Sequence, residues 1–165
     1  MKRVNNEYKL LHNTYDEVTY DDNNTSPSFN QNRIKITVKL DKNILAFTFN
    51  NDYPFKPPKM TINNIDSGKC YKISNFIMLN ELKRIYNNKC LCCETIMCPH
   101  NWSPAHRLTK IINEYNKNKI IIKYLRNYYW LLKINKLHDY MLPDLAIICI
   151  RDTLFRLEHQ QLKHP

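Results

Sequence analysis

Three prolines within five residues, at positions 54, 57 and 58, restrict the fold of this chain more than any other feature. They belong to the segment 53–59, which reads Tyr-Pro-Phe-Lys-Pro-Pro-Lys. Proline has a fixed φ and no amide proton, so it disrupts the interior of a helix and cannot donate to a sheet ladder. The segment is therefore predicted to be a stiff, extended loop.

The residues before this loop predict a helix and a β-hairpin. Val4, Tyr8 and Leu11 recur at spacings of four and three, which is the repeat of an amphipathic helix over the first dozen residues. A short strand is predicted within residues 15–20. Apolar and polar residues alternate over 34–40, which indicates a strand with one solvated face, and 44–49 form its hairpin partner.

After the loop, the pattern becomes mainly helical. A short strand at 60–62 is followed by predicted helices at 75–86, 105–115 and 120–134, and by a last helix from Leu142 to about residue 161. No linker is long enough to separate two domains. The order of elements predicts an α+β fold in a single domain, 1–165, with an N-terminal helix, an antiparallel meander sheet and C-terminal helices, the part from about 119 to 165 being helical.

Composition limits the classes of function. The 25 basic and 15 acidic residues give a formal net charge of +10, which favours acidic partners. The basic residues are spread along the chain and form no single tract, so nucleic-acid binding is not predicted. The longest apolar run, residues 145–150, is too short to span a bilayer, and no secretory signal is visible. We therefore expect a cytoplasmic or nuclear protein whose six cysteines are free thiols or metal ligands rather than disulfides.

Two motifs in this order resemble the ubiquitin-conjugating enzymes. The segment 53–59 matches that family's proline-rich loop, and Trp102-Ser103-Pro104-Ala105 matches the segment after its catalytic cysteine. The opening residues 2–9 are also similar to its first helix. The resemblance covers about the first two-thirds of the chain and implies the ubiquitin-conjugating fold. It also implies a function: in an ATP-dependent pathway, the protein would accept ubiquitin or a relative as a cysteine thioester from the activating enzyme and pass it to a lysine with a ligase.

Within this resemblance, Cys93 is the candidate nucleophile. In the family an isoleucine follows the cysteine three residues later and the tryptophan eight to ten residues later, and Ile96 and Trp102 stand at three and nine. Cys90 is the alternate, because it precedes a leucine as in the family, but it stands twelve residues before Trp102. A cysteine thiolate is a natural acyl carrier because its sulfur is soft and partly ionised.

The family's His-Pro-Asn triplet, whose asparagine stabilises the oxyanion, is missing from this sequence. Asn87 or Asn88 can supply the amide, and Asn88 is the one we assign. The absence of the triplet also allows an alternative, in which the chain is a catalytically inactive binding module with the same fold. With its missing triplet, its cysteine cluster and its biased composition, the chain resembles the divergent conjugating enzymes that large DNA viruses encode. Such an enzyme would act in the host cell.

The resemblance also implies two docking surfaces. One binds ligase domains, and the other is a basic helix face that meets the activating enzyme. The ligase-binding residues are Phe55, Lys56, Pro104 and Ala105, and the activating-enzyme-binding residues are Lys2, Arg3 and Lys9.

The cysteine cluster permits a different interpretation, a zinc-stabilised interaction domain. Cys90 and Cys93 form a Cys-x-x-Cys pair, and Cys98 with His100 completes a possible tetrahedral set. Cys70 or His106 can substitute for one of these ligands. Conjugation itself needs no cofactor. Zinc binding and the carrier function compete for Cys93, because a thiolate in a closed zinc site is a poor nucleophile. In that case Cys92, or no residue, would carry ubiquitin.

Overall fold

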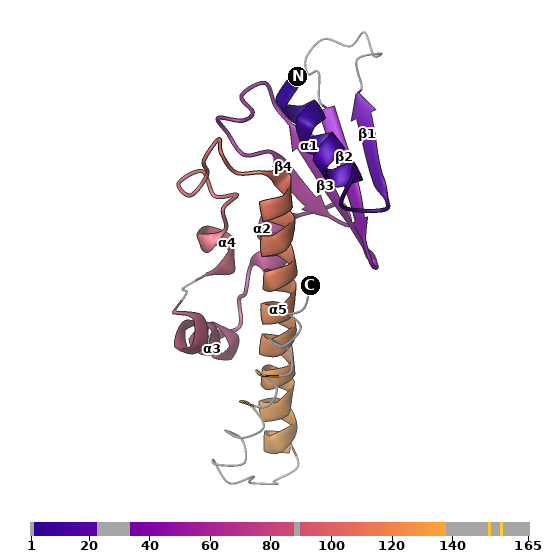
Figure 1. Cartoon of the computed structure of the whole chain (residues 1–165). Helices are drawn as coiled ribbons and strands as arrows, with labels where there is room; N and C mark the ends of the chain where they lie inside the picture. The colour runs from indigo at the N-terminus through magenta and orange to yellow at the C-terminus, as the bar shows by residue number, and fades with distance from the viewer. Residues whose placement is uncertain (1, 23–33, 88–89, 138–151, 153–155, 157–165) are drawn as a thin grey trace. The chain divides into compact units, whose positions relative to one another are not determined.

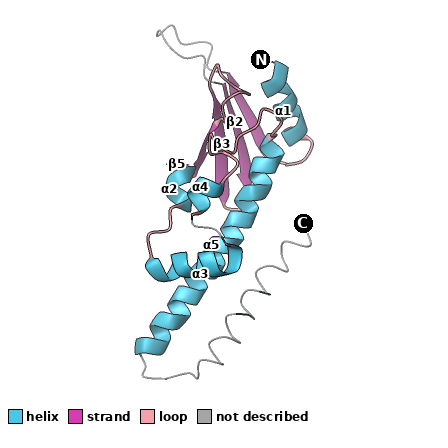
Figure 2. Cartoon of the chain, turned by 90° about the vertical axis from the view of Figure 1, so that its left-hand side faces the viewer, coloured by secondary structure: helices cyan, strands magenta, loops and turns pink. Residues whose placement is uncertain are grey.

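The computed structural model of the chain describes residues 2–22, 34–87 and 90–137, together with Asp152 and Arg156, which are both helical. The fold is α+β, with an N-terminal helix, a five-stranded antiparallel sheet and helices that follow it (Figures 1 and 2). The internal contacts divide the chain into two compact units. Unit 1 comprises Met1–Lys72 and Cys92–Asn113, and unit 2 comprises Ile73–Leu91 and Glu114–Pro165.

Unit 1 contains helix α1 and the sheet. Helix α1 (Lys2–His12) buries Val4 and Leu11 and exposes Lys2 and Lys9, so the predicted amphipathic helix is confirmed. Glu7 departs from the predicted charged outer face, because it is buried together with the apolar residues. The strands follow in chain order across the sheet and pair antiparallel, which confirms the predicted meander. They are β1 (Val18–Asp22), β2 (Ile34–Leu40), β3 (Asn43–Phe49), β4 (Lys59–Ile62) and β5 (Ile65–Asp66).

The register of the three central strands explains the core of unit 1. Ile36 of β2 pairs with Phe47 of β3, which pairs in turn with Met60 of β4. Directly paired residues point to the same face of a sheet, so these three form one buried ladder with 2% exposure or less. The same face carries the pairs that flank this ladder, Ile34 with Phe49 and Val38 with Leu45 and Ile62.

Two short elements follow β4 that the sequence pattern did not predict. Strand β5 has only two residues, and helix α2 (Ser67–Tyr71) has five. Asp66 caps α2, because its carboxylate accepts a hydrogen bond from the Gly68 amide. Elements this short contain too few residues for a periodic pattern of apolar positions to reveal them.

Unit 2 contains helix α3 (Phe76–Tyr86), which confirms the helix predicted in this region. Asn75 caps its start by accepting from the Met78 amide, and Asn87 ends it in the left-handed conformation. Inside the unit, the Glu81 carboxylate is 4% exposed; it accepts two hydrogen bonds from Arg84 and one of 2.5 Å from the Tyr124 hydroxyl. These bonds satisfy a buried charge, and they raise the pKa of Arg84.

The long helix α5 (Leu108–Leu137) corrects the prediction of two helices at 105–115 and 120–134. The 30 residues contain no proline or glycine, so the polar stretch 116–119 continues the helix rather than ending it. Its first part belongs to unit 1 and the remainder to unit 2. The helix predicted from Leu142 to about 161 lies outside the described residues, apart from Asp152 and Arg156. No described helix is long and apolar enough to cross a membrane.

Candidate functional site

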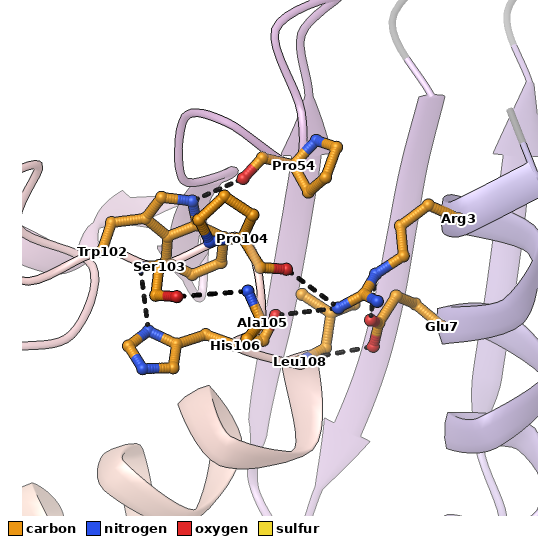
Figure 3. A network of polar contacts seen from close by, with 9 residues as sticks. All are labelled: Arg3, Glu7, Pro54, Trp102, Ser103, Pro104, Ala105, His106 and Leu108. Carbon is orange, nitrogen blue, oxygen red and sulfur yellow. Dashed lines mark hydrogen bonds and ion pairs between the residues drawn. The ribbon is translucent and has the colours of Figure 1, made fainter.

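The two segments that carry the family resemblance meet in unit 1. The Trp102 indole N–H donates a hydrogen bond of 2.7 Å to the Pro54 carbonyl, across 48 positions of sequence (Figure 3). Aromatic contacts continue from there, because the Tyr53 ring lies 6.3 Å from that of Trp102 and 4.8 Å from that of Phe49. The proline-rich loop is thereby fixed both to the sheet and to the tryptophan segment.

A buried carboxylate on α1 links this helix to the start of α5, next to the tryptophan segment. Glu7 of α1 is completely buried, and its Oε2 accepts a hydrogen bond of 3.1 Å from the amide of Leu108, the first residue of α5. Its Oε1 lies 3.0 Å from Nε of Arg3, an ion pair by distance although the two atoms are not aligned for a hydrogen bond. A negative charge at the start of a helix is stabilised by the unpaired amides and the helix dipole.

Arg3 links α1 to the tryptophan segment. Its Nη2 donates to the Pro104 carbonyl at 3.3 Å and to the His106 carbonyl at 3.2 Å (Figure 3). The guanidinium that the resemblance assigns to the activating enzyme is thus engaged within the chain. Lys2 and Lys9, assigned to the same surface, are exposed.

The tryptophan segment is also held by its own side chains. The Ser103 amide donates to Nδ1 of His106 at 3.2 Å, and the Ser103 hydroxyl accepts from the Ala105 amide at 3.3 Å. The His106 ring stands edge-on to that of Trp102, with centroids 5.6 Å apart. These local bonds give residues 102–106 a defined turn at the start of α5.

Tyr53 brings the proline-rich loop to the same buried network. Burial raises the pKa of its hydroxyl above the ordinary value of 10.0, and the nearby negative charge of Glu7 raises it further, while Arg3 opposes this. The hydroxyl is buried but makes no hydrogen bond with good geometry. We therefore treat it as an electrostatic neighbour of the Arg3–Glu7 pair rather than as a bonded member.

The residues predicted to bind a ligase are exposed. Phe55 is 79% exposed, and Pro104 and Ala105 are exposed as well. Lys56 is exposed and forms a 2.6 Å ion pair with Asp52, four residues before it in sequence. The Trp102–Pro54 bond joins the two loops that carry these residues.

The predicted nucleophile, Cys93, lies in the short helix α4 (Leu91–Glu94) and is an exposed free thiol. Cys70 and Cys98 are also free, which agrees with the expectation for the cysteines. For Cys90 and Cys92 that expectation is wrong, because both are disulfide-bonded. Only one residue, Leu91, separates them in sequence. The alternate nucleophile Cys90 therefore has no free thiol in this structure.

Asn101 is a site residue that the sequence analysis missed. Its side-chain amide donates to the carbonyls of Cys93 and Thr95, each at 3.1 Å. Backbone bonds reinforce this, because the Cys98 carbonyl accepts from the amides of both Asn101 and Trp102. Asn101 thus connects the backbone of Cys93 to the tryptophan segment. Its position next to Trp102 was the only available signal.

Asn88, to which we assigned the oxyanion role, lies outside the described residues. Among the residues that the structure does describe near Cys93, Asn101 carries an amide, and that amide is occupied by backbone carbonyls.

The predicted zinc ligands separate into two groups. The sulfurs of Cys90, Cys92 and Cys93 all lie within 4.8 Å of one another, which is close enough to hold one metal ion. Cys98 and His100 are not part of this group in the described residues. The structure thus groups Cys90 and Cys93 with Cys92 and not with Cys98 and His100.

Comparison with models of protein families, with curated proteins and with solved structures found no match to this chain.

Proposed function

We propose that this protein is a ubiquitin-conjugating enzyme, an acyltransferase in which Cys93 accepts ubiquitin, or a related modifier, as a thioester. The observation that carries the proposal is the bond between Trp102 and Pro54. Two segments were assigned to one family from sequence, and they meet in the structure although 48 positions separate them. The ubiquitin-conjugating fold, as a finer assignment than α+β, is part of the same proposal.

The state of the cysteines supports Cys93 as the acceptor. Cys93 is exposed and free, whereas Cys90 and Cys92 are disulfide-bonded. An acyl carrier must present its sulfur to a bulky partner, so exposure is a requirement rather than an incidental property. The bonds from Asn101 also hold the Cys93 backbone next to the segment that leads to Trp102.

The chemistry is two successive acyl transfers. The Cys93 thiolate attacks the thioester carbonyl of the modifier on the activating enzyme, a tetrahedral oxyanion forms, and the activating enzyme's cysteine leaves as a thiolate. A substrate lysine amine then attacks the new thioester, which gives an isopeptide bond and regenerates the Cys93 thiol. Neither step requires a metal or an organic cofactor on this chain.

The exposed residues suit the two protein partners. Phe55 sits in a loop stiffened by prolines, so little conformational entropy would be lost when a ligase domain binds it with Pro104 and Ala105. Lys2 and Lys9 offer positive charge on α1 for an acidic surface of the activating enzyme. Arg3, in contrast, is engaged within the chain by Glu7 and by the Pro104 and His106 carbonyls.

A charging assay tests the proposal directly. Activating enzyme, ATP and ubiquitin are mixed with the wild type and with Cys90→Ser, Cys92→Ser and Cys93→Ser, and products are separated on gels without reductant. Cys70→Ser is the matched control, because Cys70 is free but lies outside the cluster. We expect a thiol-sensitive adduct of one ubiquitin in every protein except Cys93→Ser, which should form a thiol-resistant ester or nothing.

The result also separates the second candidate function, a catalytically inactive binding module with the same docking surface. That alternative is favoured by one observation, that the Asn101 amide is already bonded to backbone carbonyls. A folded wild type that forms no adduct, but retains a ligase domain in a manner abolished by Phe55→Ala and not by Ile44→Ala, would establish the inactive module. Ile44 is a suitable control because it is another exposed apolar residue of unit 1, at 46% exposure.

A further inference from the structure

Three cysteine sulfurs within four consecutive residues form the most concentrated group of metal-binding atoms in the described part of the chain. Cys90, Cys92 and Cys93 lie within 4.8 Å of one another, and the sulfurs of Cys92 and Cys93 are 3.8 Å apart. Since all three lie at positions 90–93, their proximity depends only on the local backbone. All are accessible at least in part, so an ion can reach them without opening the core.

We propose that these three cysteines form a redox-gated Zn²⁺ site. In the oxidised form Cys90 and Cys92 are disulfide-bonded, as in this structure, and the cluster cannot offer three thiolates. In the reduced form three sulfurs bind one zinc ion, and the fourth position holds water. Zinc is the expected ion because thiolates favour soft or borderline metals and zinc accepts tetrahedral sulfur coordination without redox chemistry.

The gating step balances with a dithiol reductant. A dithiol donates two electrons and two protons to the disulfide, becomes a disulfide itself, and leaves Cys90 and Cys92 as thiols. Binding of Zn²⁺ then displaces one proton from each of the three cysteines, so protons are released as the ion binds. Disulfide and zinc are alternative states of the same sulfurs and exclude each other.

One consequence rests on the proposed function. Cys93 is both the third zinc ligand and the proposed ubiquitin acceptor, and a sulfur bound to zinc has its lone pair engaged. Zinc should therefore prevent charging, whereas the disulfide leaves Cys93 free to accept ubiquitin. A carrier controlled in this way would be active in the oxidised or metal-free form and silent in the zinc-bound form.

The first experiment measures the metal site without reference to charging. Full-length protein is reduced with dithiothreitol, freed of metal and reductant under anaerobic conditions, and titrated with Zn²⁺ against a chromophoric chelator. We expect about one zinc per chain. Cys90→Ser, Cys92→Ser or Cys93→Ser should each weaken affinity by more than the roughly 10–100-fold that loss of an outer ligand contact causes. Cys70→Ser and Cys98→Ser should bind as the wild type does, and the oxidised wild type should not bind until it is reduced.

A second measurement covers the case in which a variant fails to fold. Wild-type protein is alkylated with iodoacetamide with and without Zn²⁺, and each cysteine is quantified by mass spectrometry. Zinc should protect Cys90, Cys92 and Cys93 and leave Cys98 reactive. Protection of Cys98, zinc affinity unchanged by all three cluster variants, or equal binding by the oxidised protein would overturn the proposal.

The two proposals fail in different assays. If zinc binds as stated but metal-free protein does not charge, the site stands and the carrier function is wrong. If metal-free protein charges at Cys93 but the reduced cluster binds no zinc, the carrier function stands and the metal site is wrong.

Discussion

Replacing Arg3 should reveal how strongly the buried charge of Glu7 depends on its partner. Arg3→Met keeps most of the side-chain volume but removes the cation 3.0 Å from Glu7 and the two bonds to the Pro104 and His106 carbonyls. Breaking a buried ion pair by removing one partner costs about 3–5 kcal/mol. Because Arg3 is 32% exposed and the Leu108 amide still bonds Glu7, the lower end applies, about 3 kcal/mol.

Replacing the other partner of the ion pair, Glu7, should cost less stability. Glu7→Gln removes the buried charge and leaves an oxygen that can still accept from the Leu108 amide. Arg3 then keeps its carbonyl partners and some contact with water, so the expected loss is about 1 kcal/mol. In the double variant the stranded charge is absent, and the total loss should fall below the sum of the single losses by about 1–2 kcal/mol.

The two tryptophans allow unit 1 to be followed alone. Trp102 belongs to unit 1 and Trp130 to unit 2, so urea unfolding in a Trp130→Phe background reports the unit that contains Glu7. Lys9→Met, on the exposed side of the same helix, is the matched control and should change stability by no more than about 0.5 kcal/mol. The reasoning is refuted if Arg3→Met is no more damaging than Lys9→Met, or if the Arg3 and Glu7 changes are additive.

Three further predictions concern groups elsewhere in the chain. Tyr124→Phe should destabilise unit 2 by about 2 kcal/mol, because it removes a hydroxyl that bonds the buried Glu81 carboxylate; Trp130 fluorescence measures this, and an unchanged midpoint would contradict it. Since burial raises the pKa of Tyr53, the folded chain keeps this hydroxyl protonated to a higher pH than the unfolded chain, so stability is unaffected below pH 10 and falls as the pH rises through the raised value. Tyr53→Phe should therefore lose less stability than the wild type between pH 9 and pH 11, and equal losses would count against a buried hydroxyl. Burial and the charge of Asp66 raise the pKa of Cys70, so iodoacetamide at about pH 8 should alkylate it more slowly than the exposed Cys93, as peptide mapping over time would show.

Most of the regular structure was predictable because long elements repeat their signal. Helix α1, the β2–β3 hairpin and helix α3 each extend over enough residues for one buried face to be read from the sequence. Helix α5 shows the limit of this approach. Polar residues at 116–119 suggest an interruption, but without proline or glycine nothing forces the helix to end.

The candidate site was predictable as residue types but not as contacts. The sequence indicated Trp102, Phe55 and Cys93 as candidates, but it gave no sign that the indole bonds the Pro54 carbonyl or that Arg3 is engaged internally. Such contacts depend on the packing of segments up to 103 positions apart, which no local pattern records. The disulfide bonding of Cys90 and Cys92 was missed for a different reason, because the prediction of free thiols came from the compartment expected for the whole protein and not from the backbone around this pair.

The geometry around Glu7 bears on how partners at the two predicted docking surfaces would influence each other. Arg3 bonds the carbonyls of Pro104 and His106, so the exposed turn that we propose as a ligase-binding surface and helix α1 are linked through the Arg3–Glu7 ion pair. A partner that displaces α1 would loosen the turn at residues 102–106 only if it breaks the Arg3–Glu7 pair. A partner that binds only Lys2 and Lys9 leaves that pair intact. Under the proposed function, Arg3→Met should therefore weaken the binding of a ligase domain at Pro104 and Ala105 without removing any residue from that surface. Charging at Cys93 would be less affected, because Asn101 holds that backbone by bonds independent of Arg3.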